Sequence, residues 1–325
     1  MSFRRRIDMS RFFLPRHTRD QLLTNPPPLE ESELPPAAVR FHPPFSKTCN
    51  GSIDFMLLAG AGRGWGGDDD KVIATDQTGR TVMYHAGSDS IRTLCNLTAS
   101  KLAPVAFTAG GNINNLYILD NAFNPSRSRD HCFDALVYGD GDNGGGATWH
   151  VPRLALPPSA AAAVRAHPRS RIWVSKDSLG THAFDVAAGV WSKAGDWALP
   201  FCGRAHHVEE LGLWIGLNCE YGEESAVVAA DLAAAAPPTR AIGVRWWEFP
   251  PLGWIVGSSH LVHLGSDRFC HARFFETRGR CGEGYRRKFV VFAGIEVVRR
   301  GDELFVIKHR SERYDIEYRL FQRVL

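Results

Sequence analysis

The sequence predicts an all-β protein, a β-propeller of five to six four-stranded blades. Short apolar runs recur at intervals of about forty to fifty residues, which is the repeat length of propeller blades. Turn-forming residues separate the runs, and long helical patterns are scarce. We expect the ring to be closed by an N-terminal and a C-terminal strand.

Four units show the pattern most clearly, each as an apolar run, a turn and a second run. The first runs cover residues 72–75, 116–119, 172–175 and 213–216. The second runs cover residues 81–84, 135–138, 182–185 and 227–229. Runs this short, bounded by turn signals, favour strands that pair with their sequence neighbours. The helix-favouring stretches 159–166 and 229–236 are too short to be stable alone, so we expect strand-linking turns or single helical turns there.

The ends of the chain are expected to complete the last blade. Residues 304–321 have strand composition with alternating polar residues, and residues 3–13 are the candidate to pair with them. Residues 14–50 contain several proline runs, which remove backbone donors and indicate an extended surface connector. The whole chain, 1–325, is then a single domain.

Charge and cysteine content narrow the function class. The 325 residues include 38 Lys and Arg against 35 Asp and Glu, too balanced to indicate a nucleic-acid surface. No apolar run approaches the roughly 18 residues that span a bilayer, and no apolar stretch follows the basic start. The seven cysteines form no Cys-x-x-Cys pair, which suits a reducing compartment. We expect a monomer in the cytoplasm and/or nucleus that contacts neither nucleic acid nor membrane.

Three motif-like segments fail on inspection. Residues 62–67 fit a dinucleotide fingerprint, but three aspartates follow where a helix must open towards a phosphate. Residues 140–144 resemble the start of a calcium loop that lacks its later oxygen ligands. A third segment contains five side chains of the types that bind zinc, namely His260, His263, Cys270, His271 and Cys281. Neighbouring members alternate between the two faces of a strand, so we expect neither a zinc site nor a cofactor.

Acidic or amide side chains end the first apolar run of four successive units. They are Asp76, Asp120, Asp177 and Asn218. Propeller enzymes bind metals on their axis through single residues from several blades, so these four are candidates for an axial pocket. Asp and Asn at strand ends also cap turns through side-chain hydrogen bonds, and that alternative stays open.

The densest aromatic segment covers residues 246–254 and includes Trp246, Trp247 and Trp254, interrupted by two prolines. Proline removes ladder donors, so this segment cannot be a regular inner strand. Exposed tryptophan is typical of protein-binding hot spots. The segment is therefore either an interaction surface or, like Trp149 and Trp191, packed between sheets.

Several stretches together resemble a plant family that is expanded in grasses. The matching stretches are 5–12, 74–81, 180–185, 195–201, 211–216 and 260–265. That family is known as a domain of unknown function, is loosely kelch-like, and is related to F-box-associated propeller proteins, although this chain shows no F-box. The resemblance implies a β-propeller and no established chemistry.

Two functions remain in competition at this point. No nucleophile elbow, zinc-protease motif or phosphate loop occurs in the sequence, which favours a non-catalytic protein–protein interaction module with an unidentified partner. The alternative is a small-ligand or metal-dependent propeller enzyme that uses the axial residues. The aromatic segment favours the interaction module, and the recurring acids favour the enzyme.

Overall fold

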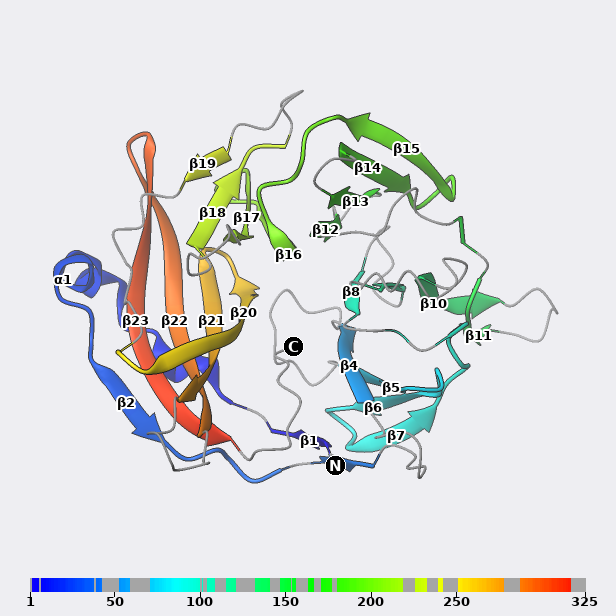
Figure 1. Cartoon of the computed structure of the whole chain (residues 1–325), viewed down its shortest axis with the longest axis horizontal. Helices are drawn as coiled ribbons and strands as arrows, with labels where there is room; N and C mark the ends of the chain where they lie inside the picture. The colour runs from blue at the N-terminus through cyan, green and yellow to red at the C-terminus, as the bar shows by residue number, and fades with distance from the viewer. Residues whose placement is uncertain are drawn as a thin grey trace. The chain divides into compact units, whose positions relative to one another are not determined.

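The computed structural model is an all-β protein with five blades arranged as a β-propeller, which confirms the predicted fold class (Figure 1). It describes residues 2–5, 7–37, 39–42, 53–58, 71–99, 101, 104–108, 115–120, 132–140, 147–152, 154–155, 163–166, 171–176, 180–218, 226–232, 239–241, 251–277 and 287–316. The chain divides into two compact units. One comprises residues 1–42, 208–231 and 239–324, and the other residues 43–207, 232–238 and 325. Within the described residues, no helix is long and apolar enough to cross a membrane.

Three blades of the second unit follow the predicted repeat. Their strands are β4 (Ile53–Leu58), β5 (Lys71–Asp76), β6 (Thr81–His85) and β7 (Ser90–Thr93); β8 (Val105–Thr108), β9 (Leu116–Leu119), β10 (Phe133–Asp140) and β11 (Ala147–His150); and β12 (Ala163–Ala166), β13 (Arg171–Lys176), β14 (Gly180–Asp185) and β15 (Val190–Gly195). Within each blade every strand pairs antiparallel with the next, as when Val72 lies opposite Tyr84. Both expected helical turns are wrong in part, because residues 163–166 form β12 and residues 229–230 end β18.

The fourth blade continues the third in one sheet. Its strands are β16 (Cys202–Val208), β17 (Leu213–Asn218), β18 (Ala226–Ala230) and β19 (Thr239–Ala241), and β12 pairs with β16 in parallel. Alternating apolar side chains form the cores of the second unit. Trp149 and Trp191 pack against two of its apolar clusters, as the sequence predicts, and Trp191 lies edge-on to Phe133.

The fifth blade has the longest strands and lies entirely in the first unit. It consists of β20 (Trp254–Gly265), β21 (Arg268–Thr277), β22 (Lys288–Arg300) and β23 (Glu303–Ile316). A fifth strand, β2 (Leu29–Ser32), adds to β23 in parallel. The expected pairing of an N-terminal with a C-terminal strand is therefore confirmed, with β2 in place of residues 3–13.

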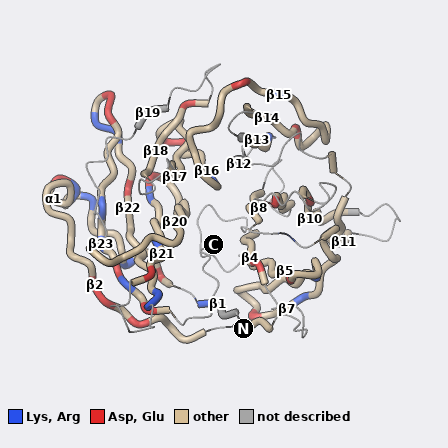
Figure 2. Tube along the Cα trace, in the orientation of Figure 1, with Lys and Arg blue, Asp and Glu red and all other residues tan. Residues whose placement is uncertain are grey.

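The N-terminal segment takes short helical and extended forms around this blade. It contains β1 (Ser2–Arg4), the 3₁₀ helices η1 (Met9–Phe12) and η2 (Arg16–Thr18), the helix α1 (Arg19–Thr24) and β3 (Val39–Phe41), and β1 pairs with β3. The Asp8 carboxylate accepts a hydrogen bond from the Ser10 amide, which starts η1 and prevents a continuous strand over residues 3–13. The expected connector 14–50 thus carries η2, α1, β2 and β3. Figure 2 shows acidic and basic residues interspersed along α1, β2, β22 and β23.

Candidate functional site

Of the recurring acids, Asp76 uses its carboxylate locally. Asp76 Oδ1 accepts hydrogen bonds from the Thr78 amide at 2.7 Å and the Arg80 amide at 3.1 Å, so it caps the turn between β5 and β6. The Asp120 amide donates to the Cys132 carbonyl at 2.8 Å and so prolongs the pairing of β9 with β10.

Asn218 ends β17 and is partly buried, while Asp177 lies outside the described residues. No group of three or more His, Cys, Asp and Glu side chains that could hold a metal ion occurs in the described part of the chain.

The zinc-type residues that the structure describes lie in β20 and β21 of the fifth blade. The His263 Nε2 atom lies 2.7 Å from the Ser266 carbonyl oxygen, and the His260 ring lies edge-on to Phe274. Cys270 and His271 are successive buried residues of β21, so they point to opposite faces. Cys281 lies outside the described residues.

Trp254 is the one tryptophan of the aromatic segment that the structure describes, because Trp246 and Trp247 lie outside the described residues. Its indole packs on Phe289 at 4.4 Å and on Phe275 at 5.1 Å between ring centroids. Trp254 is half-buried, whereas Leu252 is fully exposed and Ile255 is 41% exposed. We call Leu252, Trp254 and Ile255 the β20 patch. It combines an anchored indole with two solvent-exposed aliphatic side chains, and Trp254 and Ile255, as successive strand residues, point to opposite faces of β20.

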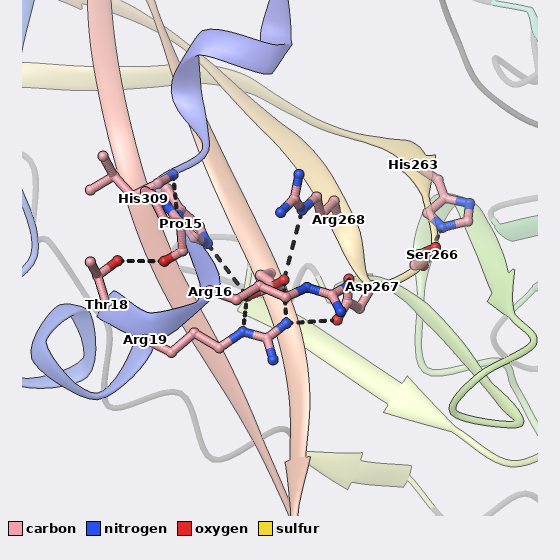
Figure 3. Close-up of polar contacts among 11 residues, drawn as sticks. Pro15, Arg16, Thr18, Arg19, His263, Ser266, Asp267, Arg268 and His309 are labelled. Atoms are coloured by element: carbon pink, nitrogen blue, oxygen red, sulfur yellow. Dashed lines mark hydrogen bonds and ion pairs between the residues drawn. The ribbon is translucent and has the colours of Figure 1, made fainter.

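A buried ionic cluster joins the N-terminal segment to the fifth blade (Figure 3). Arg19, the first residue of α1, donates from Nε to Glu296 Oε2 at 2.7 Å and from Nη2 to Glu296 Oε1 at 2.5 Å. The same Nη2 reaches Asp267 at 3.2 Å. Glu296 has an exposed fraction of 0%. Bidentate pairing of this kind is the strongest form of an arginine–carboxylate contact.

Other polar groups complete the surroundings of Glu296. The Leu14 amide donates to His309 Nδ1 at 3.1 Å, so the other ring nitrogen, Nε2, carries the proton and faces Glu296 Oε2 at 3.6 Å. Arg268 Nε lies 3.7 Å from Glu296 Oε1. Burial alone raises the pKa of Glu296, but its contacts with His309 and Arg19 outweigh burial and bring it to about 2. Glu296 is therefore an ion held by surrounding cations and donors.

A second contact anchors η1 to β23. Arg11 Nη2 donates to Glu312 at 2.5 Å and to the Tyr314 hydroxyl at 2.6 Å, and that hydroxyl donates to Glu312. Burial, followed by the hydrogen bond to Glu312, raises the pKa of Tyr314 to about 12. The buried Phe12 packs against Gly294, where an added Cβ would lie 3.0 Å from the Phe12 Cβ.

These contacts form a clamp, which we define as Arg11, Phe12, Arg19, Glu296 and Glu312. The clamp fastens η1 and α1 to the sheet, and its carboxylates are engaged by arginines within the chain. Sequence reasoning did not find it, because its partners are about 300 positions apart in the chain. Basic and apolar residues are mixed in residues 4–23, and this pattern indicates a segment that packs on the domain and not a solvated tail.

Comparison with known proteins gives a family and no chemistry. A family model described as a protein of unknown function (DUF1668) matches residues 3–314. The search of curated proteins found no match. The matched range includes both the clamp and the β20 patch.

Proposed function

The chain belongs to the DUF1668 family, and we propose that it is a non-catalytic β-propeller module that binds another protein. The observation that carries this proposal is the β20 patch. Two aliphatic side chains are exposed at the start of β20, Ile255 on the face opposite to Trp254, whose ring is fixed by Phe275 and Phe289. Rigid aromatic anchors with apolar neighbours are typical of binding hot spots.

The backbone around the patch suits a contact. β20 is the last strand of its sheet in the described part of the chain, with β21 on its one paired side. In its first half, Ile255 and Gly257 are exposed, whereas Leu261 and Val262 further along are buried. Covering this half of the strand would remove apolar surface from water without disturbing the core beneath.

Thiol and charge content support an intracellular setting for the module. Cys95, Cys132 and Cys270 are thiols, and burial raises the pKa of each, which makes them poor nucleophiles. Basic and acidic residues are nearly equal in number over the whole chain. We therefore propose a monomer of the cytoplasm and/or nucleus whose partner is a protein, not nucleic acid or a membrane.

The test compares two pairs of exposed apolar residues. Leu252→Ser with Ile255→Ser removes the aliphatic part of the patch, and Ile91→Ser with Val190→Ser is the matched control. The control residues are 59% and 54% exposed and lie on the edge strands β7 and β15. Each protein is used as bait in cell extract with quantitative mass spectrometry.

We expect proteins that the unchanged chain and the control pair both retain to be lost from the patch pair. Affinity for such a partner should fall at least 30-fold, which corresponds to about 2 kcal/mol. Melting temperatures of all three proteins should agree. Equal capture by both variant pairs would contradict the proposal.

A further inference from the structure

His271 is a buried histidine in the middle of the fifth blade. Its side chain is 5% exposed, and neither ring nitrogen has a hydrogen-bond partner within the structure. Buried polar groups are ordinarily hydrogen-bonded, so an imidazole left without a partner in an apolar layer is a costly exception. None of the contacts of the clamp or of the β20 patch uses this ring.

The neighbours of His271 on its own face are apolar. It lies opposite Leu261 on β20 and Ala293 on β22, and directly opposite residues point to the same face. Leu261 and Ala293 belong to a buried cluster that also contains Ile215 and Leu217 of β17. All of these residues lie in the first unit. The ring therefore lies in the packing layer that this face of the blade shares with β17.

The charged groups on this face are three cations and two carboxylates, Glu31 and Asp315, which accept hydrogen bonds from Arg313 at 3.3 and 3.2 Å. Arg273 follows His271 by two residues on β21, and Lys308 lies opposite Ile295, a member of the same buried cluster. Arg313 lies opposite Val291, two residues before Ala293 on β22. Strands β17 and β18 contribute no titratable side chain, and Glu296 and Glu312 alternate onto the other face. The carboxylates on this face, Glu31 and Asp315, are thus paired with Arg313, and neither bonds to the His271 ring.

We propose that His271 is a proton-sensitive element whose protonation opens the packing of the fifth blade against β17. In the packed state the ring is neutral, because a charge there would have neither solvent nor a bonded counter-ion. In the opened state the ring is hydrated and binds a proton as an ordinary histidine does. Acid therefore favours the opened state.

The pH dependence of the opened-to-packed ratio follows from the difference between the pKa of His271 in the two states. Burial, with smaller contributions from Arg273 and His260, lowers the pKa of His271 from 6.5 to about 3. A base with a lower pKa in the packed state gains a proton on opening, so packing is fully kept above about pH 6.5 and is lost as the pH falls towards 3. Between pH 7 and pH 5 the ratio of opened to packed molecules should rise about 25-fold.

Native-state hydrogen exchange measures this ratio. Protection factors, corrected for the intrinsic exchange rate at each pH, are recorded for peptides from β17 and β21 at pH 7 and pH 5. We expect protection in both strands to fall about 25-fold in the unchanged chain. His271→Gln keeps a polar side chain without the titration, and its protection should change less than about twofold. The control His17→Gln alters an exposed residue of η2 and should retain the full effect.

A second measurement covers the case in which His271→Gln does not fold. Nitrogen-15 NMR of labelled histidine in the unchanged chain reports the protonation state of the ring directly. We expect the His271 ring of the packed protein to remain neutral at pH 5. A protonated ring with unchanged protection in β17 and β21 would overturn the proposal, as would an unaltered pH response in a folded His271→Gln protein.

Discussion

Replacing Arg19 with methionine keeps a long side chain at the start of α1 and removes the cation that pairs with Glu296. Glu296 then remains in a site with 0% exposure and loses two hydrogen bonds, of 2.7 and 2.5 Å. His309 at 3.6 Å and Arg268 at 3.7 Å are too distant to replace them. Removing one partner of a buried ion pair costs about 3–5 kcal/mol. Because Arg19 itself is partly exposed, we expect the lower end, about 3 kcal/mol.

The assay is urea denaturation, with the free energy of unfolding extrapolated to water and the slope compared between proteins. Arg300→Met is the control, since Arg300 pairs with Asp20 on the same helix at the surface. An exposed pair contributes about 0–1 kcal/mol, so the control should be nearly neutral. The double variant Arg19→Met with Glu296→Gln removes the stranded charge and should recover part of the loss.

The dependence of the free energy of unfolding on acid pH is a second test of the clamp. The Glu296 pKa is about 2 in the folded chain and 4.5 ordinarily, so its stabilisation is present above pH 4.5 and is lost as the pH falls towards 2. Arg19→Met should reduce this loss, because the folded-state pKa of Glu296 then lies closer to its ordinary value. Equal stabilities of Arg19→Met and Arg300→Met, with equal acid profiles, would refute the clamp.

Three further outcomes follow from packing and composition. Gly294→Ala should destabilise the protein by about 1–3 kcal/mol in thermal melts, because its Cβ would lie 3.0 Å from Phe12, whereas Gly257→Ala, with 3.6 Å to its nearest neighbour, should cost less. Lys101→Met should cost about 3 kcal/mol in urea denaturation, since the buried Asp134 carboxylate loses its counter-ion at 2.6 Å and keeps the Thr98 amide and hydroxyl as donors. Far-ultraviolet circular dichroism should be dominated by strand, and a helix content above about a third would contradict the fold.

The repeat pattern made the blades accessible to prediction because it is a local property. The runs 72–75 and 81–84 are each short and apolar, and they form β5 and β6 as expected. Asp76 after the first run is also explained locally, since it caps the turn that joins them. Strand existence and turn chemistry depend on neighbours within a few residues, which the sequence displays directly.

The clamp depends on partners that local patterns do not connect. The Asp8 side chain bonds to the Ser10 amide and starts a 3₁₀ helix near the beginning of the chain. The N-terminal strand that pairs with β23 is therefore Leu29–Ser32 and not residues 3–13. Glu296 occupies a strand position between apolar residues, and its burial becomes intelligible once Arg19 lies beside it. The burial of a charge is decided by its distant partner, so composition and spacing alone did not indicate it.

The most direct test of the proposed interaction function is site-specific photo-cross-linking at the β20 patch. A photoreactive amino acid is placed at Leu252, and in a control protein at Val190, an exposed position on β15. Both proteins are irradiated in cell extract at equal concentration, and the adducts are identified by mass spectrometry. We predict a defined protein adduct from position 252 that excess unlabelled chain competes away and that position 190 does not form. The same adducts from both positions, or none that unlabelled chain displaces, would contradict the assignment of the β20 patch as a binding surface.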